Sequence, residues 1–232
     1  MRFAIVLVAL LAAAAPARAQ GGLFDAVGDA PAVSLRPFFQ FSNEWFSASQ
    51  TFNAVFGDDS AQFWGGGGQV TLWHGRVYGE VGVSRLVKND QTLVGQRVFV
   101  GDDGGVFRLG IPVRVTIEPL EFTGGYRFNV HPRVIPYVGA GFGIYHYTED
   151  SDFATSAEKV DVTKNGAIFH AGVEFRAFRW IGVAMDGQYT HLPGILGEGG
   201  ASQQFAEGTG SSAKGEADLG GWAARFKVVF GR

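Results

Sequence analysis

The side chains best placed to do chemistry in this chain are charges of both signs that alternate with apolar residues. Nine of them fall on the polar faces of such alternating stretches: Arg36, Glu80, Glu121, Arg127, Glu174, Arg176, Asp186, Arg225 and Lys227. Charges removed from water must be paired, and this set contains both signs. We therefore expect these nine residues to form a charge network in the interior of the fold.

The histidines are the remaining candidates for catalysis. His146 and His191 lie beside Thr148 and Thr190, and a His with a nearby hydroxyl and carboxylate could form a hydrolytic site. The sequence has no GxSxG elbow, no HExxH motif and no phosphate-binding loop, and it contains no Cys. We therefore expect no enzymatic activity, catalytic residue or cofactor.

Three acidic stretches could hold a divalent cation at the surface. They are Asp58-Asp59, Asp102-Asp103 and the segment from Glu149 to Asp152. Solvated acidic loops are the simpler interpretation, so we expect no metal site.

Alternation of apolar and polar residues predicts the elements that must position these side chains. From Trp180 to His191, Ile181, Val183 and Met185 share one face, and Asp186, Gln188 and Thr190 are in the opposite phase. The chain also contains 35 Gly and 21 Phe among 232 residues, which suits strands and tight turns better than helices. We read eight strands: Val33–Phe46, Gln62–Trp73, Arg76–Val87, a fourth containing Val113 to Phe128, Val134–Thr148, Thr163–Arg176, Trp180–His191 and Asp218–Phe230.

The connectors between these strands alternate long and short. Polar loops are expected at 47–61, 88–105, 149–162 and 192–217, and tight turns at 74–75, 129–133 and 177–179. Tight turns at one end and long loops at the other are typical of outer-membrane barrels. The sequence therefore predicts an all-β protein: one eight-stranded antiparallel up-and-down transmembrane β-barrel with both termini in the periplasm.

The fourth strand contains a change of phase. Val113, Val115 and Ile117 alternate in one phase, and Leu120, Phe122 and Tyr126 in the other, with Glu118-Pro119 between them. Because Pro cannot donate to a ladder, we interpret this point as a bulge in one long strand. Two separate strands are the alternative.

Alternation does not say which face points outward. A soluble lipocalin-like carrier would place its apolar face inside, around a ligand. Here the polar face is mostly Gly, Ser, Thr and Gln with few charges, whereas a solvated outer face carries far more Lys and Glu. We therefore expect apolar side chains to face lipid and the charges to be enclosed. Inside an eight-stranded barrel, which side chains just fill, the charges would form a packed core or line a narrow conduit.

The N-terminus has the form of a secretory signal. Arg2 precedes the apolar run Phe3–Ala15, and Ala17-Arg18-Ala19 resembles a cleavage site. We predict a signal peptide at 1–19, a flexible periplasmic leader at 20–32 and the barrel at 33–232. A net charge of −3 argues against a nucleic-acid partner.

Three segments resemble the small outer-membrane β-barrel family of the OmpA-barrel, OmpW and opacity-protein kind. They are Gly124-Gly125-Tyr126-Arg127-Phe128, the stretch PYVGAGFG from Pro136 to Gly143, and Gly172-Val173-Glu174-Phe175-Arg176. The resemblance implies an eight-stranded barrel in a Gram-negative outer membrane, in contact with its lipid and inserted by the barrel-assembly machinery. OmpW-like members further imply passage of small hydrophobic solutes.

The function expected from these observations is that of a structural surface barrel with a packed polar interior. A narrow passive pore, or an OmpW-like conduit for small hydrophobic molecules, is the alternative. A soluble periplasmic lipocalin-like carrier is the second alternative.

Overall fold

A computed structural model of the chain describes residues 31–87, 91–100, 105–128, 130–151, 159–196, 216 and 218–231. The predicted signal peptide and most of the predicted leader, residues 20–30, lie outside these ranges. The elements are β1 (Val33–Phe46), α2 (Ser49–Phe56), β2 (Ser60–Leu72), β3 (Val77–Leu86), β4 (Leu93–Val100), β5 (Val106–Arg127), β6 (Val134–Ser151), β7 (Val160–Arg176), β8 (Ile181–His191) and β9 (Gly221–Phe230). Within the described residues, no helix combines the length and apolarity needed to cross a bilayer.

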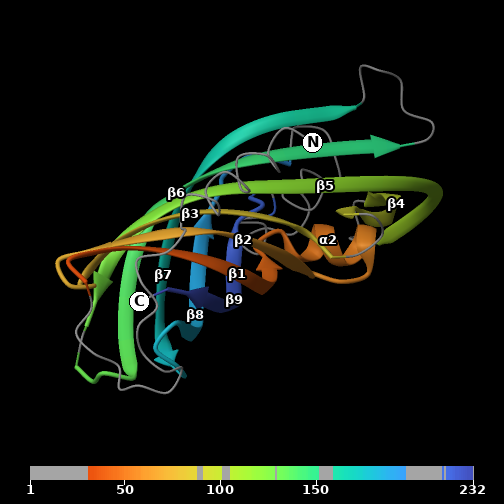
Figure 1. Cartoon of the computed structure of the whole chain (residues 1–232). Coiled ribbons are helices and arrows are strands. Elements are labelled where there is room, and N and C mark those ends of the chain that lie inside the picture. Colours follow the sequence, from red (N-terminus) through yellow and green to blue (C-terminus); the bar gives the residue numbers. More distant parts are fainter. Residues whose placement is uncertain are drawn as a thin grey trace.

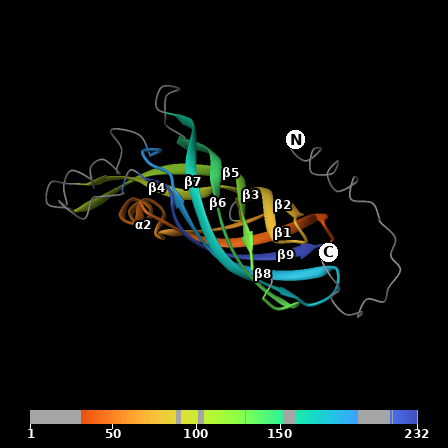
Figure 2. The same cartoon turned by 90° about the vertical axis from the view of Figure 1, so that its left-hand side faces the viewer.

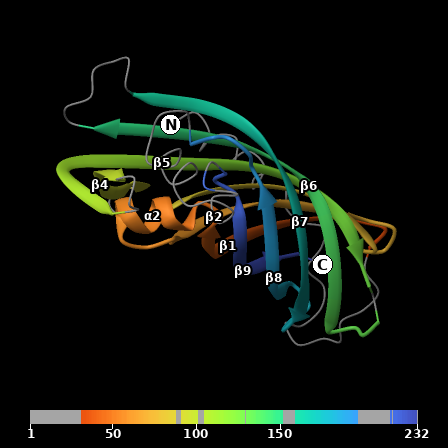
Figure 3. The same ribbon diagram turned by 180° about the vertical axis from the view of Figure 1, so that it is seen from behind.

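Eight of the strands close into an antiparallel barrel. The order around the sheet is β3-β2-β1-β9-β8-β7-β6-β5, and a β3–β5 pairing joins its two ends. The first and last strands of the barrel are neighbours, with Phe38 of β1 opposite Val229 of β9. Figures 1 and 3 show the barrel from opposite sides. The predicted eight-stranded antiparallel barrel is confirmed, and β4 is an additional strand outside the closed ring.

Short turns lie at one end of the barrel and long connections at the other. The turns join β2 to β3, β5 to β6 and β7 to β8, and β1 starts and β9 finishes at this same end. In the first turn Trp73 and His74 both adopt positive φ, and Gly75 follows with φ 77°, a backbone that reverses the chain within four residues. We call this the turn end and the opposite one the loop end.

Apolar side chains cover the outer surface of the barrel. Phe142 is 51% exposed and Phe226 is 42% exposed, while Glu174 and Arg225 on the opposite face are 2% and 4% exposed. A lipocalin-like barrel would show the reverse arrangement. The exterior is therefore suited to hydrocarbon, and the interior carries the charges.

Aromatic side chains border this apolar surface at both ends. Near the loop end, Trp45, Trp222 and Tyr189 lie in one row across β1, β9 and β8, with the rings of Trp222 and Tyr189 5.1 Å apart. Near the turn end the exposed aromatic residues include Trp73, Phe128, Phe175, Phe178, Trp180 and Phe230. On β9 the two borders are about 26 Å apart along the strand, close to the 9–11 residues with which a strand crosses a membrane.

The loop end is elongated on one side. β7 pairs with β8 only as far as Ala167, whereas its pairing with β6 continues to Val160. β5 likewise continues past its last partner on β3, Leu120 opposite Val83, and forms a hairpin with β4. The prediction of a loop across residues 88–105 is therefore wrong for residues 93–100. Figure 2 shows these hairpins extending beyond the wall of the barrel.

The phase change at Glu118-Pro119 is not a bulge. β5 is one strand, and its register with β6 runs without interruption from Val113 opposite Ser151 to Arg127 opposite Tyr137. Val113, Val115 and Ile117 point inward, as Arg127 does, because the interior itself changes from polar to apolar along the axis. Pro119 lies just beyond the last β3–β5 pair, so its missing N–H leaves no gap in that ladder.

A short helix and an apolar cluster fill the inside of the loop end. The predicted polar loop 47–61 contains α2, whose Phe52 stacks on Phe46 with ring centroids 4.2 Å apart. We call the whole group the apolar cap. Its buried members are Phe46, Ala48, Phe52, Ala61, Phe63, Leu86, Leu93, Val113, Val115, Ile117, Tyr145, Tyr147, Leu192, Ile195 and Leu219.

The spacing of Phe52 and Phe56 followed by Gly57 is the sequence signal that this prediction overlooked. Apolar residues four apart share one helix face. Gly57 adopts φ 78° and ends the helix by donating its N–H to the carbonyl of Asn53.

Candidate functional site: the charged interior

Glu174 of β7 is the centre of a cluster near the turn end. Its carboxylate oxygens lie 2.5 and 3.0 Å from the two terminal nitrogens of Arg36, and 2.9 Å from Arg127 Nη2. Arg176 Nε approaches at 3.5 Å. Gln69 Oε1 accepts hydrogen bonds from both Arg36, at 2.8 Å, and Arg127, at 2.9 Å. We call these five residues the Glu174 cluster. One carboxylate and one amide thus hold three guanidinium groups from three strands.

Asp186 of β8 is the centre of a second cluster, deeper in the barrel. It lies 2.5 Å from Arg225 Nε and 3.7 Å from Lys227 Nζ, and it accepts a hydrogen bond of 2.6 Å from the Tyr137 hydroxyl. Lys227 also pairs with Glu80 at 2.5 Å. The two clusters are joined because Gln69 donates to Glu80 at 3.1 Å.

His170 of β7 links Arg225 to Tyr78. Arg225 Nη2 is 2.5 Å from His170 Nδ1, and the Tyr78 hydroxyl is 2.6 Å from Nε2. Because a guanidinium only donates, Nδ1 must accept. His170 is therefore a neutral imidazole whose Nε2–H donates to the Tyr78 oxygen.

Glycines on the inner face make room for these contacts. A Cβ on Gly139 would lie 2.2 Å from His170 Nε2 and 2.3 Å from the Tyr78 hydroxyl. A Cβ on Gly143 would lie 2.5 Å from the ring of Tyr145, which crosses this position. Two inward glycines of the PYVGAGFG segment are thus explained by the large side chains that lie over them.

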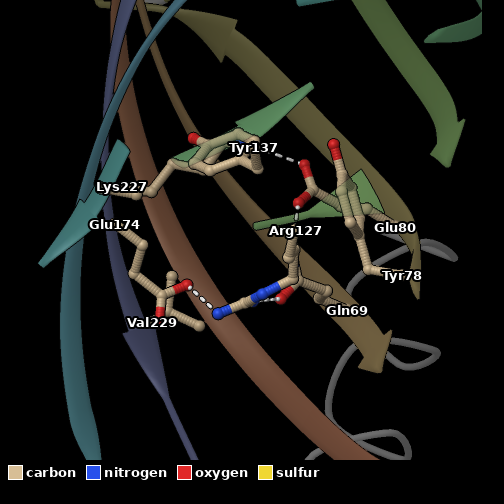
Figure 4. Close-up of a pocket in the computed structure, with 9 residues that line it drawn as sticks. Gln69, Tyr78, Glu80, Arg127, Tyr137, Glu174, Lys227 and Val229 are labelled. Atoms are coloured by element: carbon tan, nitrogen blue, oxygen red, sulfur yellow. Dashed lines mark hydrogen bonds and ion pairs between the residues drawn. The ribbon is translucent and has the colours of Figure 1, made fainter. Parts of the chain in front are cut away.

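Little free space remains between these side chains. The cavity beside Arg127 and Glu174 has a volume of about 10 Å³, which is room for about one water molecule. Figure 4 shows Arg127, Glu174 and Gln69 directed toward one another, with Tyr78, Tyr137 and Lys227 around the same space. The interior at this level is filled by side chains.

All nine charged residues named from the sequence lie inside the barrel. Arg36, Arg127, Glu174 and Arg176 meet in the Glu174 cluster, and Glu80, Asp186, Arg225 and Lys227 meet around Asp186. Glu121 stands apart: it lies 3.4 Å from Arg225 and accepts hydrogen bonds from Tyr145 at 3.0 Å and Gln188 at 2.8 Å.

The neutral members of the network are not among the residues predicted from the sequence. They are Gln69, Tyr78, Tyr137, His170 and Gln188. Tyr78, His170 and Gln188 lie in the same inward phase as Glu80, Glu174 and Asp186 of their own strands, so parity of position is the signal by which these three could have been found. Gln69 lies on β2, which contains no charged residue.

The two histidines considered for catalysis lie outside this charge network. His146 is half-buried and contacts Thr163 at 3.1 Å, and His191 is exposed at the end of β8. Across the described parts of the chain, no three His, Cys, Asp or Glu side chains come together as a metal site would require.

No protein-family model matches the sequence, and no curated protein matches it. Among solved structures, it is similar to the N-terminal β-barrel domain of Pseudomonas aeruginosa OprF, with 12% identity, 85% of this chain and 97% of that chain covered, and a TM-score of 0.44. Neisserial surface protein A is 10% identical over 88% of this chain and 98% of its own, with a TM-score of 0.45. The outer membrane protein AlkL, solved in lipid bilayers, is 12% identical over 93% of this chain and 97% of its own, with a TM-score of 0.34. The similarity to these structures is a similarity of fold alone.

Proposed function

We propose that this chain is a non-enzymatic outer-membrane barrel whose interior is closed, and that it serves as a structural surface barrel rather than as an open pore. The observation that carries the proposal is that side chains fill the interior of the barrel. Two linked charge clusters occupy the interior toward the turn end, and the apolar cap occupies the loop end. A solute moving along the axis would have to displace both.

The orientation follows from the two ends. In bacterial barrels the short turns face the periplasm and the longer loops face outward. β1 starts and β9 finishes at the turn end, so both ends of the barrel domain would lie in the periplasm. The hairpins of β4–β5 and β6–β7 would then project from the cell surface.

Location is tested by fractionating cells and by heating the purified protein before electrophoresis in detergent. A folded barrel of this kind resists detergent and migrates differently until it is boiled. We expect the protein only in the detergent-extracted envelope, with a mobility that changes on boiling. Release by osmotic shock without detergent would support the soluble carrier instead.

Closure is tested by reconstitution into planar bilayers. The proposed structural barrel predicts silence over the usual range of voltages. Regular single-channel steps from the unmodified protein would contradict it.

One observation favours the alternative of a conduit for small hydrophobic molecules. The interior at the loop end is lined by apolar residues such as Phe63, Leu86 and Val115, and α2 occupies the middle of this group. An apolar solute could enter only where α2 moves aside. Saturable uptake of a small alkane into liposomes containing the protein, without ionic conductance, would support this alternative over the closed barrel.

A further inference from the structure

Each of the three turns at the turn end carries an arginine and no carboxylate. Arg76 lies in the turn from β2 to β3, Arg133 in the turn from β5 to β6 and Arg179 in the turn from β7 to β8. Arg76 and Arg133 are exposed, and Arg179 is half-buried. None of the three connections, from the last residue of one strand to the first residue of the next, contains an Asp or a Glu. We call these three residues the arginine rim.

Backbone hydrogen bonds place the three turns next to one another. The carbonyl of Arg76 accepts a hydrogen bond of 2.7 Å from the N–H of Arg127, the residue at which the turn from β5 to β6 begins. The carbonyl of Arg133 accepts one of 2.8 Å from the N–H of Arg176, at which the turn from β7 to β8 begins. The three arginines therefore follow one another along one edge of the barrel.

Within the described part of this end, the arginine rim has no exposed counter-charge. The acidic residues nearest to these turns along the chain, Glu80 and Glu174, are buried in the barrel and form ion pairs there. The Nε of Arg179 is buried and has no hydrogen-bond partner among the described residues. Because a buried N–H without an acceptor is costly, this guanidinium requires an acceptor from outside the described chain.

The loop end does not show the same excess of positive charge. Arg85 lies 3.8 Å from Glu118, and Lys159 lies 2.8 Å from Asp150, with all four side chains well exposed. Carboxylates of the chain thus offset cations at the loop end, whereas the arginine rim requires anions from another molecule.

Exposed aromatic side chains lie beside the arginine rim. Trp73, three residues before Arg76, is 70% exposed. Phe178 and Trp180 flank Arg179, whose guanidinium carbon lies 5.7 Å from the centre of the Trp180 ring. Tryptophan at the border of an apolar surface lies at the level of the lipid headgroups, and the planar guanidinium matches the oxygens of a phosphate. The neighbouring arginines are therefore at a suitable depth for lipid phosphates.

We infer that the arginine rim binds the phosphates of anionic phospholipids in the leaflet at the turn end. This inference rests on the proposed function, because it takes the apolar outer surface to lie in a bilayer. Anionic headgroups supply the acceptor that Arg179 lacks and the counter-charge that the turns do not contain. A zwitterionic headgroup offsets its own phosphate with an ammonium group, so the arginine rim selects lipids of net negative charge.

The experiment measures the quenching of tryptophan fluorescence by brominated lipids, which reports the lipid beside each tryptophan. The protein without its predicted signal peptide is folded into vesicles of phosphatidylcholine and phosphatidylglycerol, with one or the other brominated. A variant with Trp45→Phe, Trp64→Phe and Trp222→Phe keeps tryptophan only at the turn end. A second variant, with Trp73→Phe and Trp180→Phe, keeps tryptophan only at the loop end.

We expect phosphatidylglycerol to bind about fivefold more tightly than phosphatidylcholine at the turn end, the size expected for one basic residue at an anionic surface, and about equally at the loop end. The combined change Arg76→Gln, Arg133→Gln and Arg179→Gln should remove the preference at the turn end. Arg85→Gln, which removes an exposed arginine of the loop end, is the matched control and should leave it unchanged. If the triple variant does not fold, NaCl at about 1 M, which reduces the screening length to about 3 Å, should remove the preference of the chain that keeps its arginines.

Equal binding of the two lipids at the turn end of an inserted barrel, or a preference that survives the triple substitution, would overturn this inference and leave the proposed function intact. A chain that does not insert, and whose mobility does not change on boiling, would contradict the proposed function as well. Inorganic phosphate added at constant ionic strength should leave the preference unchanged. Loss of the preference in phosphate would show that the free anion, and not the lipid, is the ligand.

Discussion

Arg36 and Glu174 form a two-point ion pair across the barrel, although 138 residues separate them in the chain. Arg36 lies on β1 and Glu174 on β7, two strands that are not neighbours in the sheet. Both side chains are almost completely buried. Such a contact ties opposite walls together, which hydrogen bonds between adjacent strands cannot do.

Removal of Glu174 should therefore be one of the most destabilising single changes in the barrel. Glu174→Ala leaves Arg36 and Arg127 buried side by side without a counter-charge. Breaking a buried pair in this way costs about 3–5 kcal/mol. Unfolding in urea, followed by tryptophan fluorescence in micelles, should show a midpoint shifted strongly downward.

Arg176→Ala should have a smaller effect in the same direction. Its nearest contact with Glu174 is 3.5 Å, and its side chain retains some exposure. The reference variant is Arg85→Ala, which removes an exposed pair with Glu118 at 3.8 Å and an exposed hydrogen bond to Gln91 at 3.1 Å. Exposed ion pairs contribute about 0–1 kcal/mol. If all three variants unfold at the same urea concentration, the Glu174 cluster does not stabilise the barrel.

Gly139→Ala should disrupt the network without changing any charge. The added methyl group would occupy the place of the hydrogen bond between His170 and Tyr78, with contacts of 2.2 and 2.3 Å. Overpacking of a filled interior costs typically about 1–3 kcal/mol. The control is Gly79→Ala, a strand glycine where a Cβ would meet nothing within 4 Å. We expect a lower urea midpoint for the first variant and little change for the second.

Much of the barrel could be predicted from the sequence because the outer and inner faces of its strands lie in such different environments. An apolar outer surface and an ionic interior produce the alternation of Val183 and Met185 with Asp186 and Gln188, which identifies strand and face together. The same rule fails where both surroundings are apolar. Ile117 points into the apolar cap, so the apolar phase changes at Glu118-Pro119 although the strand continues.

The pairings inside the barrel could not be predicted in this way. Alternation shows that Arg36 and Glu174 point inward, but their contact depends on strand order, stagger and the lengths of both side chains. The helix α2 and the strand β4 were missed for a related reason, because both lie in segments whose polar residues resembled those of solvated loops.

A positive charge on the outer face should be tolerated according to its depth. Met185 is well exposed in the middle of β8, and Val33 is well exposed at the turn end of β1. A Lys on the lipid face costs about 2–4 kcal/mol at the centre of the bilayer and about 0–1 near its edges. Folding into lipid vesicles, measured by the shift on a heat-modifiability gel, should be impaired by Met185→Lys and nearly normal for Val33→Lys. Equal folding of the two variants would argue that the exterior does not contact hydrocarbon.

Glu216 should control how firmly α2 is held over the interior. Its carboxylate accepts hydrogen bonds from the backbone N–H groups of Gln50, at 3.1 Å, and Thr51, at 2.9 Å, and from the Thr51 hydroxyl at 2.7 Å. The first N–H groups of a helix have no partner within the helix, so this carboxylate supplies the missing acceptor and favours the helix dipole.

Glu216→Ala should destabilise this end of the barrel by about 1.5–3 kcal/mol, the usual contribution of a hydrogen bond to a charged group. Amide hydrogen exchange across residues 49–56 should become faster, while exchange in β8 and β9 stays slow. Asp161→Ala, which removes an exposed carboxylate 3.7 Å from His146, is the control and should leave α2 unchanged. If α2 closes the interior, the Glu216 variant should also show occasional conductance in planar bilayers where the unmodified protein is silent. Unaltered exchange in α2 would show that the apolar contacts of Phe52 hold the helix without this carboxylate.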